Sequence, residues 1–291
     1  MKNLILTLII TLPLTLWGQG WEQTYYLNDN PQFHYGVGWS VIETDDDTYI
    51  ISGHSNVMDE NGSFIETVVL CKIQTTLETN GLLLWKEFYT PGWGSSVKET
   101  LDNGFIILNT PNNFNSPVEL IKTGSSGNIE WIQNYEDING GGNVFNVQLT
   151  NDEGYIFSTM EKIVKTNSQG VIEWIFNETN NNGTVYSTND NSYLFTGSSP
   201  RFLSKLNNNG ISEWIYYPYG EEDSDGYWLS IIENSSGEYV ISGENEITKI
   251  NNQGGVLWSI SPHNQVDLSS TFSCTYYNTY EVSGGGYISV G

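Results

Sequence analysis

The chain has 291 residues, with 34 acidic and 10 basic side chains and a formal net charge of −24 at pH 7. Such an excess of negative charge repels nucleic acid and anionic membrane surfaces, so we exclude nucleic-acid binding. The 18 tyrosines, 11 phenylalanines and 10 tryptophans supply enough large apolar side chains for a folded core, which excludes an intrinsically disordered chain.

Residues 1–20 have the pattern of a secretory signal peptide. Lys2 gives the positive start, an apolar run extends from Leu4 to Leu16, and small residues such as Gly18 follow it. The apolar run is shorter than the roughly 20 residues that cross a bilayer, which argues against a membrane anchor. We therefore predict a secreted, cell-surface or periplasmic protein with no membrane insertion, whose mature domain spans residues 21–291.

A motif of about 43 residues recurs along the rest of the chain. Its most regular part is Lys-x4-Gly-x3-Trp, which occurs four times with identical spacing. A fifth copy, between Lys72 and Trp85, carries four extra residues before its glycine. The other repeat positions are Lys122, Lys165, Lys205 and Lys249; Gly127, Gly170, Gly210 and Gly254; and Trp131, Trp174, Trp214 and Trp258.

Each repeat has the pattern of four short strands joined by turns. In the first repeat, residues 40–44 and 49–53 predict the first two strands, and turn residues 45–47 separate them. The lysine lies on the predicted third strand and the tryptophan on the fourth. No segment has the periodicity of an amphipathic helix, so we predict an all-β fold. Four antiparallel strands repeating at this length make one blade of a β-propeller, and stacked blades cover one another's faces.

The repeat residues have structural explanations. The glycine suits a turn that needs a positive φ, and the tryptophan is large enough to fill the space between adjacent blades. We expect the lysine stem to cross apolar surface while its charge stays in water, with Glu130, Glu173 and Glu213 as cross-strand partners. The alternative is that the five lysines form an anion site.

The two ends of the chain complement each other. Residues 21–25 match the pattern of a fourth strand, and residues 279–291 supply a first and a second strand. We therefore predict five complete blades and a split sixth. Two explanations stay open for its missing third strand: a ring that closes at six blades, or a truncated chain. Cys71 and Cys274 would lie in adjacent blades of a closed ring, where they either form a disulfide or remain independent.

The repeat resembles those of secreted bacterial β-propeller proteins over residues 21–291. The residues that carry the resemblance are the Tyr-Ile-Ile-Ser-Gly unit at 49–53 and the Lys-x4-Gly-x3-Trp unit, most closely at 120–123 and 127–131. The Gly-x3-Trp element is also similar to the tryptophan-docking repeat of quinoprotein-like propellers. The resemblance implies the fold and leaves the function open.

No catalytic constellation is evident. His34, His54 and His263 lack metal-ligand spacing, and the single arginine, Arg201, argues against a sialidase-like site, which needs several. We expect no cofactor. One calcium candidate is the acidic segment 221–226, whose ligands would be Glu221, Asp223 and Asp225; the alternative is a solvated acidic loop.

Aromatic residues near the predicted rim loops are the candidate binding residues, because exposed rings stack on sugars or anchor proteins. These are Trp39, just before the first predicted strand, and Trp93, Tyr219, Tyr227 and Trp228 on loops that connect successive blades. Blade-to-blade packing is the alternative for each. We therefore favour a non-enzymatic, monomeric binding module for a glycan or protein. The alternatives are a polysaccharide lyase or hydrolase, a degenerate quinoprotein-type enzyme, or a fragment of a larger surface protein.

Overall fold

The computed structural model describes residues 36–44, 46, 48–75, 81–110, 116–139, 144–177, 183–218, 228–244, 246–260, 278–282 and 286–290. Within these residues the chain forms 22 strands in six antiparallel sheets, five of four strands and one of two. The described residues contain no helix that is long and apolar enough to cross a membrane. The predicted all-β fold of four-stranded antiparallel blades is confirmed.

Each four-stranded sheet is one blade, and its strands pair in chain order. Blade 1 contains β1 (Gly36–Glu43), β2 (Thr48–Met58), β3 (Phe64–Gln74) and β4 (Leu82–Pro91), and blade 2 contains β5 (Ser96–Glu99), β6 (Phe105–Asn109), β7 (Pro117–Thr123) and β8 (Ile129–Asn139). Blade 3 contains β9 (Val144–Leu149), β10 (Tyr155–Thr159), β11 (Lys162–Thr166) and β12 (Ile172–Asn177), and blade 4 contains β13 (Val185–Ser187), β14 (Tyr193–Ser198), β15 (Arg201–Leu206) and β16 (Ser212–Tyr216). Blade 5 contains β17 (Trp228–Glu233), β18 (Tyr239–Gly243), β19 (Glu246–Ile250) and β20 (Val256–Ile260), and β21 (Asn278–Val282) and β22 (Gly286–Val290) form the last sheet.

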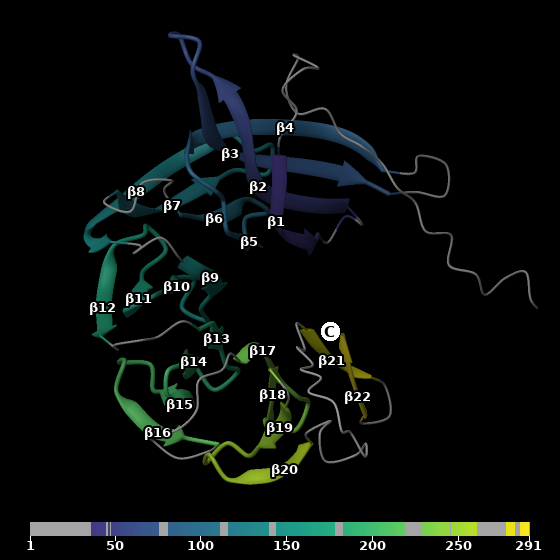
Figure 1. Cartoon of the computed structure of the whole chain (residues 1–291), viewed down its shortest axis with the longest axis vertical. Helices are drawn as coiled ribbons and strands as arrows, with labels where there is room; N and C mark the ends of the chain where they lie inside the picture. Colours follow the sequence, from purple (N-terminus) through teal and green to yellow (C-terminus); the bar gives the residue numbers. More distant parts are fainter. Residues whose placement is uncertain are drawn as a thin grey trace, which may run out of the picture.

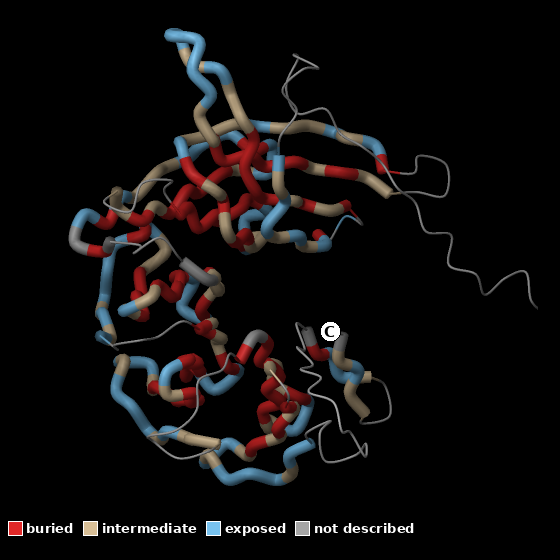
Figure 2. Tube along the Cα trace, in the orientation of Figure 1, coloured by how far each residue is buried: buried red, intermediate tan, exposed pale blue. Residues whose placement is uncertain are grey.

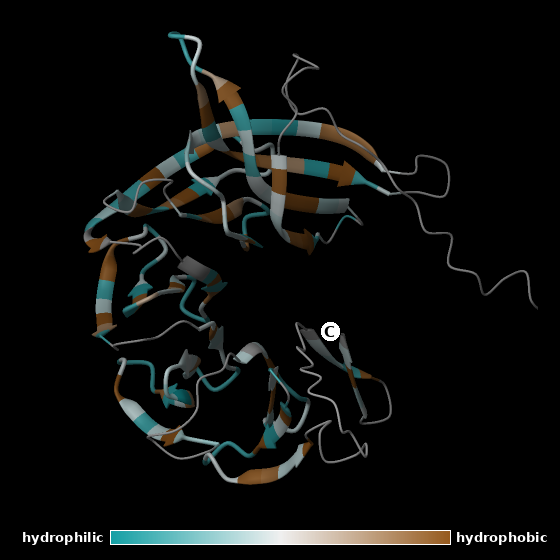
Figure 3. Cartoon of the chain, in the orientation of Figure 1, coloured by the Kyte–Doolittle hydropathy of each residue, from teal (hydrophilic) through white to brown (hydrophobic). Residues whose placement is uncertain are grey.

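The sheets follow one another around a common centre, and the arc brings β21 and β22 back towards β1 (Figure 1). The first strands of the blades face this centre: β1 contacts β5, β5 contacts β9, β9 contacts β13, and β17 contacts β21. The fourth strands lie on the outside, where Figure 2 shows mostly exposed and intermediate residues. Figure 3 shows apolar residues along the strands throughout the arc.

The hydrophobic core consists of clusters that each join two neighbouring blades. One cluster, for example, combines Leu108 and Leu120 of blade 2 with Val147 and Phe157 of blade 3. Similar clusters join blades 1 and 2, blades 3 and 4, and blades 4 and 5. A four-stranded sheet has two apolar faces, so each blade depends on its neighbours to remove those faces from water.

The tryptophan of one blade packs on the glycine turn of the next. Gly210 lies between β15 and β16 with φ +74°, and a Cβ atom there would lie 2.8 Å from the Trp174 ring of blade 3. The same relation joins Trp85 to Gly127, Trp131 to Gly170 and Trp214 to Gly254. These glycines therefore meet two requirements at once: a left-handed backbone in a tight turn and room for an indole.

Three of the five repeat lysines, Lys122, Lys165 and Lys205, differ from expectation, because their charges are buried rather than in water. Lys165 is 1% exposed, and its ammonium donates to Asp152 at 2.8 Å, to Glu173 at 2.7 Å and to the Thr166 carbonyl at 2.9 Å. The aspartate comes from the turn between the first and second strands of the blade. A buried ammonium needs such partners, since an unpaired buried charge is strongly unfavourable.

The other repeat lysines have comparable partners. Lys122 pairs with Asp102 and Glu130, and Lys205 pairs with Asp190 at 2.6 Å and with Glu213 at 3.8 Å. Lys72 pairs with Asp46, and Lys249 pairs with Glu238. Burial alone would raise the pKa of Asp102, but hydrogen bonds from Lys122 and Thr100 lower it to about 2. Glu130, Glu173 and Glu213 are therefore partners of the lysines as expected, but each lysine also pairs with an aspartate from the turn between the first and second strands.

Some sequence-based predictions lie outside the described residues. These are the signal peptide at 1–20, the fourth strand at 21–25 and Cys274. Cys71 on β3 is 5% exposed, and burial raises the pKa of its thiol to about 12.

Replacing Gly210 with alanine tests the contact between tryptophan and glycine. We expect Gly210→Ala to lower the free energy of unfolding by about 3 kcal/mol, because the methyl group meets the indole and the backbone is left-handed. The control is Gly237→Ala, with a φ of +71° and only one atom, 4.0 Å away, near its added Cβ. It should cost about 1 kcal/mol. Urea denaturation measures the free energies of unfolding. Equal decreases for the two variants would show that the contact with the indole contributes nothing to stability.

Candidate functional site

Four side chains from four elements meet at one rim of blade 1: Trp39, His54, Glu66 and Trp93. We call them the rim cluster. Trp39 is on β1, His54 on β2, Glu66 on β3, and Trp93 lies in the connection from β4 to β5. The ring centroids are 6.0 Å apart for Trp39 and His54, 6.2 Å for His54 and Trp93, and 6.4 Å for the two tryptophans. The planes of the three rings differ by 31–36°, so together they form a shallow aromatic platform.

Hydrogen bonds fix the polar edges of both indoles. Trp39 Nε1 donates to His54 Nδ1 at 3.0 Å, and Trp93 Nε1 donates to Glu66 Oε2 at 2.6 Å. Since Nδ1 of His54 accepts, a neutral His54 carries its proton on Nε2, which lies 3.8 Å from Glu66 Oε1. His54 and Glu66 thus fix the orientation of the two indoles through their N–H groups. The ring faces of the indoles remain available for a ligand.

Trp39 owes its position to a β-bulge. Gly38 pairs with Gly53 and Ser40 pairs with Ser52, so Trp39 is the extra residue of β1 between two regular pairs. A Cβ atom on Gly53 would lie 1.9 Å from the Val37 carbonyl oxygen, so only glycine permits this approach of β1 to β2. The bulge leaves Trp39 53% exposed.

Side chains of neighbouring strands hold the backbone around Trp93 on both sides. It follows Gly92, where a Cβ atom would lie 2.0 Å from Asn109 Oδ1, and its own N–H donates to that oxygen at 3.0 Å. On the other side, Ser52 Oγ donates to the Gly94 carbonyl at 2.9 Å. The amide of Asn109 also donates to Glu119 at 2.8 Å. The connection from blade 1 to blade 2 is thus anchored, and Trp93 is pre-organised.

The electrostatics of the cluster favour a neutral imidazole. Burial lowers the pKa of His54 below its usual value, and the nearby Glu66 opposes this shift only in part. His54 is 3% exposed, whereas the Glu66 side chain is 35% exposed. The carboxylate therefore contributes the negative charge of the site and reaches solvent.

The structure brings together two of the five predicted binding residues. Trp39 was expected just before the first strand, but β1 begins earlier and includes it. Trp93 lies in the connection between blades, where it was expected. Trp228 was expected on a loop, but it begins β17 and is 1% exposed, with the Arg201 guanidinium carbon 3.6 Å from its ring centroid. Arg201 Nη1 also donates to the Glu244 carbonyl, so this pair packs blade 4 against blade 5.

The remaining predicted residues lie outside the described part of the chain. These are the binding candidates Tyr219 and Tyr227 and the calcium candidates Glu221, Asp223 and Asp225. Among the described residues, no group of three or more His, Cys, Asp or Glu side chains has the arrangement of a metal site.

His54 and Glu66 were not predicted as site residues. Both lie where the β2–β3 hairpin of blade 1 extends beyond the repeat, since each of these strands has 11 residues, compared with five in β10 and β11. The wider spacing between Tyr49 and Lys72 than between Tyr155 and Lys165 was the available signal. It marks blade 1 as the blade that departs most from the others.

Comparisons with known proteins address the fold. No protein-family model matches the chain, and no curated protein matches it. Among solved structures, the WD40 domain of Pan2 from Neurospora crassa is similar with a TM-score of 0.58 and 10% identity, over 90% of this chain and 75% of that one.

Two bacterial structures are similar as well. Virginiamycin B lyase from Staphylococcus aureus has a TM-score of 0.56 and 12% identity, over 81% of this chain and 72% of that one. A protein of unknown function from Bacteroides caccae has a TM-score of 0.52 and 12% identity, over 80% of this chain and 84% of that one. At these identities the similarity shows the fold alone: the chain is a β-propeller.

Proposed function

We propose that the chain is an exported, non-enzymatic propeller that binds a neutral glycan at the rim cluster. The observation that carries this proposal is the pair of indoles, Trp39 and Trp93, whose polar edges are fixed by His54 and Glu66. Sugar rings present C–H faces that pack on aromatic rings, and a rigid platform loses little entropy on binding.

The charge of the molecule favours a neutral glycan over an acidic one. Glu66 lies at the edge of the platform, and the chain as a whole has a net charge of −24. Uronic acids, sulfated sugars and sialic acids would be repelled. The partly exposed carboxylate of Glu66 is instead suited to accept hydrogen bonds from sugar hydroxyl groups.

A lyase activity is the alternative, because one structural neighbour is named virginiamycin B lyase. His54 is the obvious candidate base, but its geometry does not favour that role. Nδ1 accepts the hydrogen bond from Trp39, Nε2–H faces Glu66, and the ring is 3% exposed. A general base needs a free lone pair within reach of the substrate. The geometry therefore supports His54 as a positioning residue for Trp39.

The wild-type protein, expressed as residues 21–291, should bind neutral glycans on a glycan array. We expect Trp39→Ala to weaken binding of the best glycan at least tenfold, because the exposed half of the platform is lost. Ile215→Ala is the control, since Ile215 on β16 of blade 4 is 46% exposed and lies on another blade. Isothermal titration calorimetry gives the affinities. Absence of any glycan ligand, or unchanged affinity of Trp39→Ala, would refute the proposal.

Acidification should weaken both the platform and the fold through His54. Its folded pKa lies below the unfolded value of about 6.5, so the unfolded state takes up the proton first. The contribution of neutral His54 to stability is therefore complete above pH 6.5 and is lost as the pH falls through the folded pKa. Protonated Nδ1 can no longer accept from Trp39.

We expect the free energy of unfolding of the wild-type protein to decline as the pH falls below 6.5, and its glycan affinity to decline as the pH falls through the folded pKa of His54. The His54→Gln variant should show a smaller decline over this range, since it has no titrating ring at this position. Identical pH profiles for the two proteins would mean that the decline comes from other groups.

A further inference from the structure

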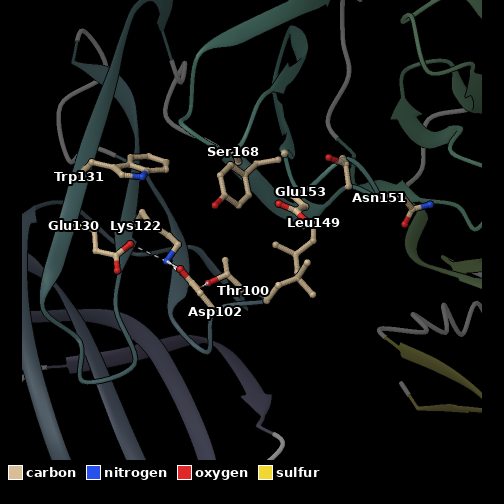
Figure 4. A pocket seen from close by; sticks show the side chains of 13 residues that line it. Thr100, Asp102, Lys122, Glu130, Trp131, Leu149, Asn151, Glu153 and Ser168 are labelled. Carbon is tan, nitrogen blue, oxygen red and sulfur yellow. Dashed lines mark hydrogen bonds and ion pairs between the residues drawn. The ribbon is translucent and has the colours of Figure 1, made fainter.

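A cavity lies between blades 2 and 3, at the end of the strands opposite the rim cluster. Its volume is about 480 Å³, within the range of small-ligand pockets. The wall comes from three turns: β5–β6 with Asp102, β9–β10 with Glu153, and β11–β12 with Ser168. Lys122 and Trp131 complete the part that Figure 4 shows, with Lys122 between Asp102 and Glu130.

Trp131 lacks a hydrogen bond that two of its counterparts make. In the next two blades, Trp174 Nε1 donates to the Asn208 carbonyl and Trp214 Nε1 donates to the Asn252 carbonyl, each at 3.1 Å. Ser168 holds the position of Asn208 in this junction, but no hydrogen bond joins it to Trp131 within the described part of the chain. The indole edge therefore faces the cavity that Ser168 also lines.

Tyr155 is a buried polar side chain on the same wall. It is 3% exposed, and its hydroxyl group has no hydrogen-bond partner among the described residues. Burial, together with the charges of Asp102 and Glu130, raises the pKa of this phenol to about 12, so it stays neutral. Its oxygen atom is thus available to a ligand as an acceptor and a donor.

The equivalent aromatic ring in two other blades already has an ammonium group above it. Lys205 Nζ lies 5.6 Å from the ring centroid of Tyr239, and Lys249 Nζ lies 5.7 Å from that of Tyr287. No described cation occupies this place over Tyr155. The repeat itself therefore shows which chemical group this ring position accepts.

The cavity wall has an excess of negative charge. Three carboxylates, Asp102, Glu130 and Glu153, line it together with one ammonium group, that of Lys122. Lys122 is engaged by Asp102 at 2.8 Å and by Glu130 at 3.0 Å. The Glu153 carboxylate has no ion-pair or hydrogen-bond partner within the described residues, so it is left for a cation from solution.

Glu153 is also unusual for its place in the turn. It has a φ of +66°, a left-handed conformation that glutamate disfavours. The equivalent turn residues in blades 2, 4 and 5 are Asn103, Asn191 and Gly237, which tolerate this conformation better. Glutamate is therefore less favourable here than asparagine or glycine, and it places a carboxylate at the cavity.

We propose that the cavity between blades 2 and 3 is a binding site for an alkylammonium group, with Glu153 as the counter-ion and the rings of Trp131 and Tyr155 as the aromatic walls. Such a group comes either from a free aliphatic amine or from a lysine side chain of a peptide. This site is independent of the glycan site proposed at the opposite end of the strands.

The indole N–H signals in a ¹H–¹⁵N correlation spectrum provide the test, because Trp131→Phe identifies the Trp131 signal. Titration with n-butylammonium chloride should shift that signal saturably, whereas 1-butanol, which has no charge, should not. N-acetyl-lysine amide and N-acetyl-norleucine amide form the corresponding pair for the peptide source. Tighter binding of the lysine derivative than of butylammonium assigns the site to a peptide, and equal binding assigns it to a free amine.

Two variants of equal size separate charge from folding. Asn and Asp both tolerate a left-handed backbone, so Glu153→Asn and Glu153→Asp should both be at least as stable as the wild-type protein. We expect Glu153→Asn to bind butylammonium about fivefold more weakly than Glu153→Asp, because only the aspartate keeps the counter-ion. Glu136→Gln, which removes an exposed carboxylate of β8 outside the cavity, should bind like the wild-type protein.

The proposal is overturned if n-butylammonium leaves the Trp131 signal in place, or if 1-butanol shifts it equally. It is also overturned if Glu153→Asn and Glu153→Asp bind n-butylammonium with the same affinity.

Discussion

The contact between a tryptophan of one blade and a glycine of the next is the constraint on which the rest of the structure depends. The indole can lie flat on the following turn only because that turn has no Cβ atom, and the turn needs glycine for its positive φ as well. This contact repeats between blades 1 and 2, 2 and 3, 3 and 4, and 4 and 5. It fixes the distance between sheets, and the apolar clusters between blades form at that distance.

The ion-paired repeat lysines are the polar counterpart of this packing. Each lies beneath the tryptophan strand, paired across the sheet with the repeat tryptophan itself, as Lys165 is with Trp174. Its ammonium group ties the turn between the first and second strands to the third strand. Each lysine forms an ion pair with one or two acidic residues, so part of the large negative charge of the chain is neutralised within the blades. The arrangement favours one register of each hairpin, since a slip would leave an ammonium group buried without a partner.

The repeat made the blades predictable. The second strand predicted at 49–53 lies within β2, and the same pattern, an aromatic residue followed by β-formers and bounded by turns, forms β6, β10 and β18. The burial of the lysine ammonium groups was not predictable. A strand in which a lysine alternates with apolar residues is compatible with an ammonium group in water and with a buried one. What decides is Asp102 or its equivalent, which comes from a turn some 20 residues earlier in the chain.

The candidate site was half predictable for a related reason. Trp39 and Trp93 stood out as aromatic residues near predicted connections, but the bulge that exposes Trp39 depends on how β1 pairs with β2. His54 and Glu66 belong to strands, where a polar residue has no distinctive pattern. Trp228 has the same sequence appearance as Trp93 but is covered by Arg201, which is 27 residues away in the chain.

Both proposed sites lie where a blade departs from the repeat: the extended hairpin of blade 1, and the turn of blade 3 where Glu153 stands in the place of asparagine or glycine. The central claim is that repeat residues hold the fold and departures from the repeat bind ligands. The most direct test compares two tryptophans, measuring urea unfolding and glycan affinity for Trp174→Leu and for Trp39→Leu. The equivalent bulge position in blade 5 is already a leucine, Leu229.

We expect Trp174→Leu to lower the free energy of unfolding by about 3 kcal/mol with unchanged glycan affinity, because it empties the space over Gly210. Trp39→Leu should cost only about 1 kcal/mol of stability, that of the hydrogen bond to His54, and should weaken glycan binding at least tenfold. Equal destabilisation by the two replacements, with glycan affinity retained in Trp39→Leu, would contradict the account.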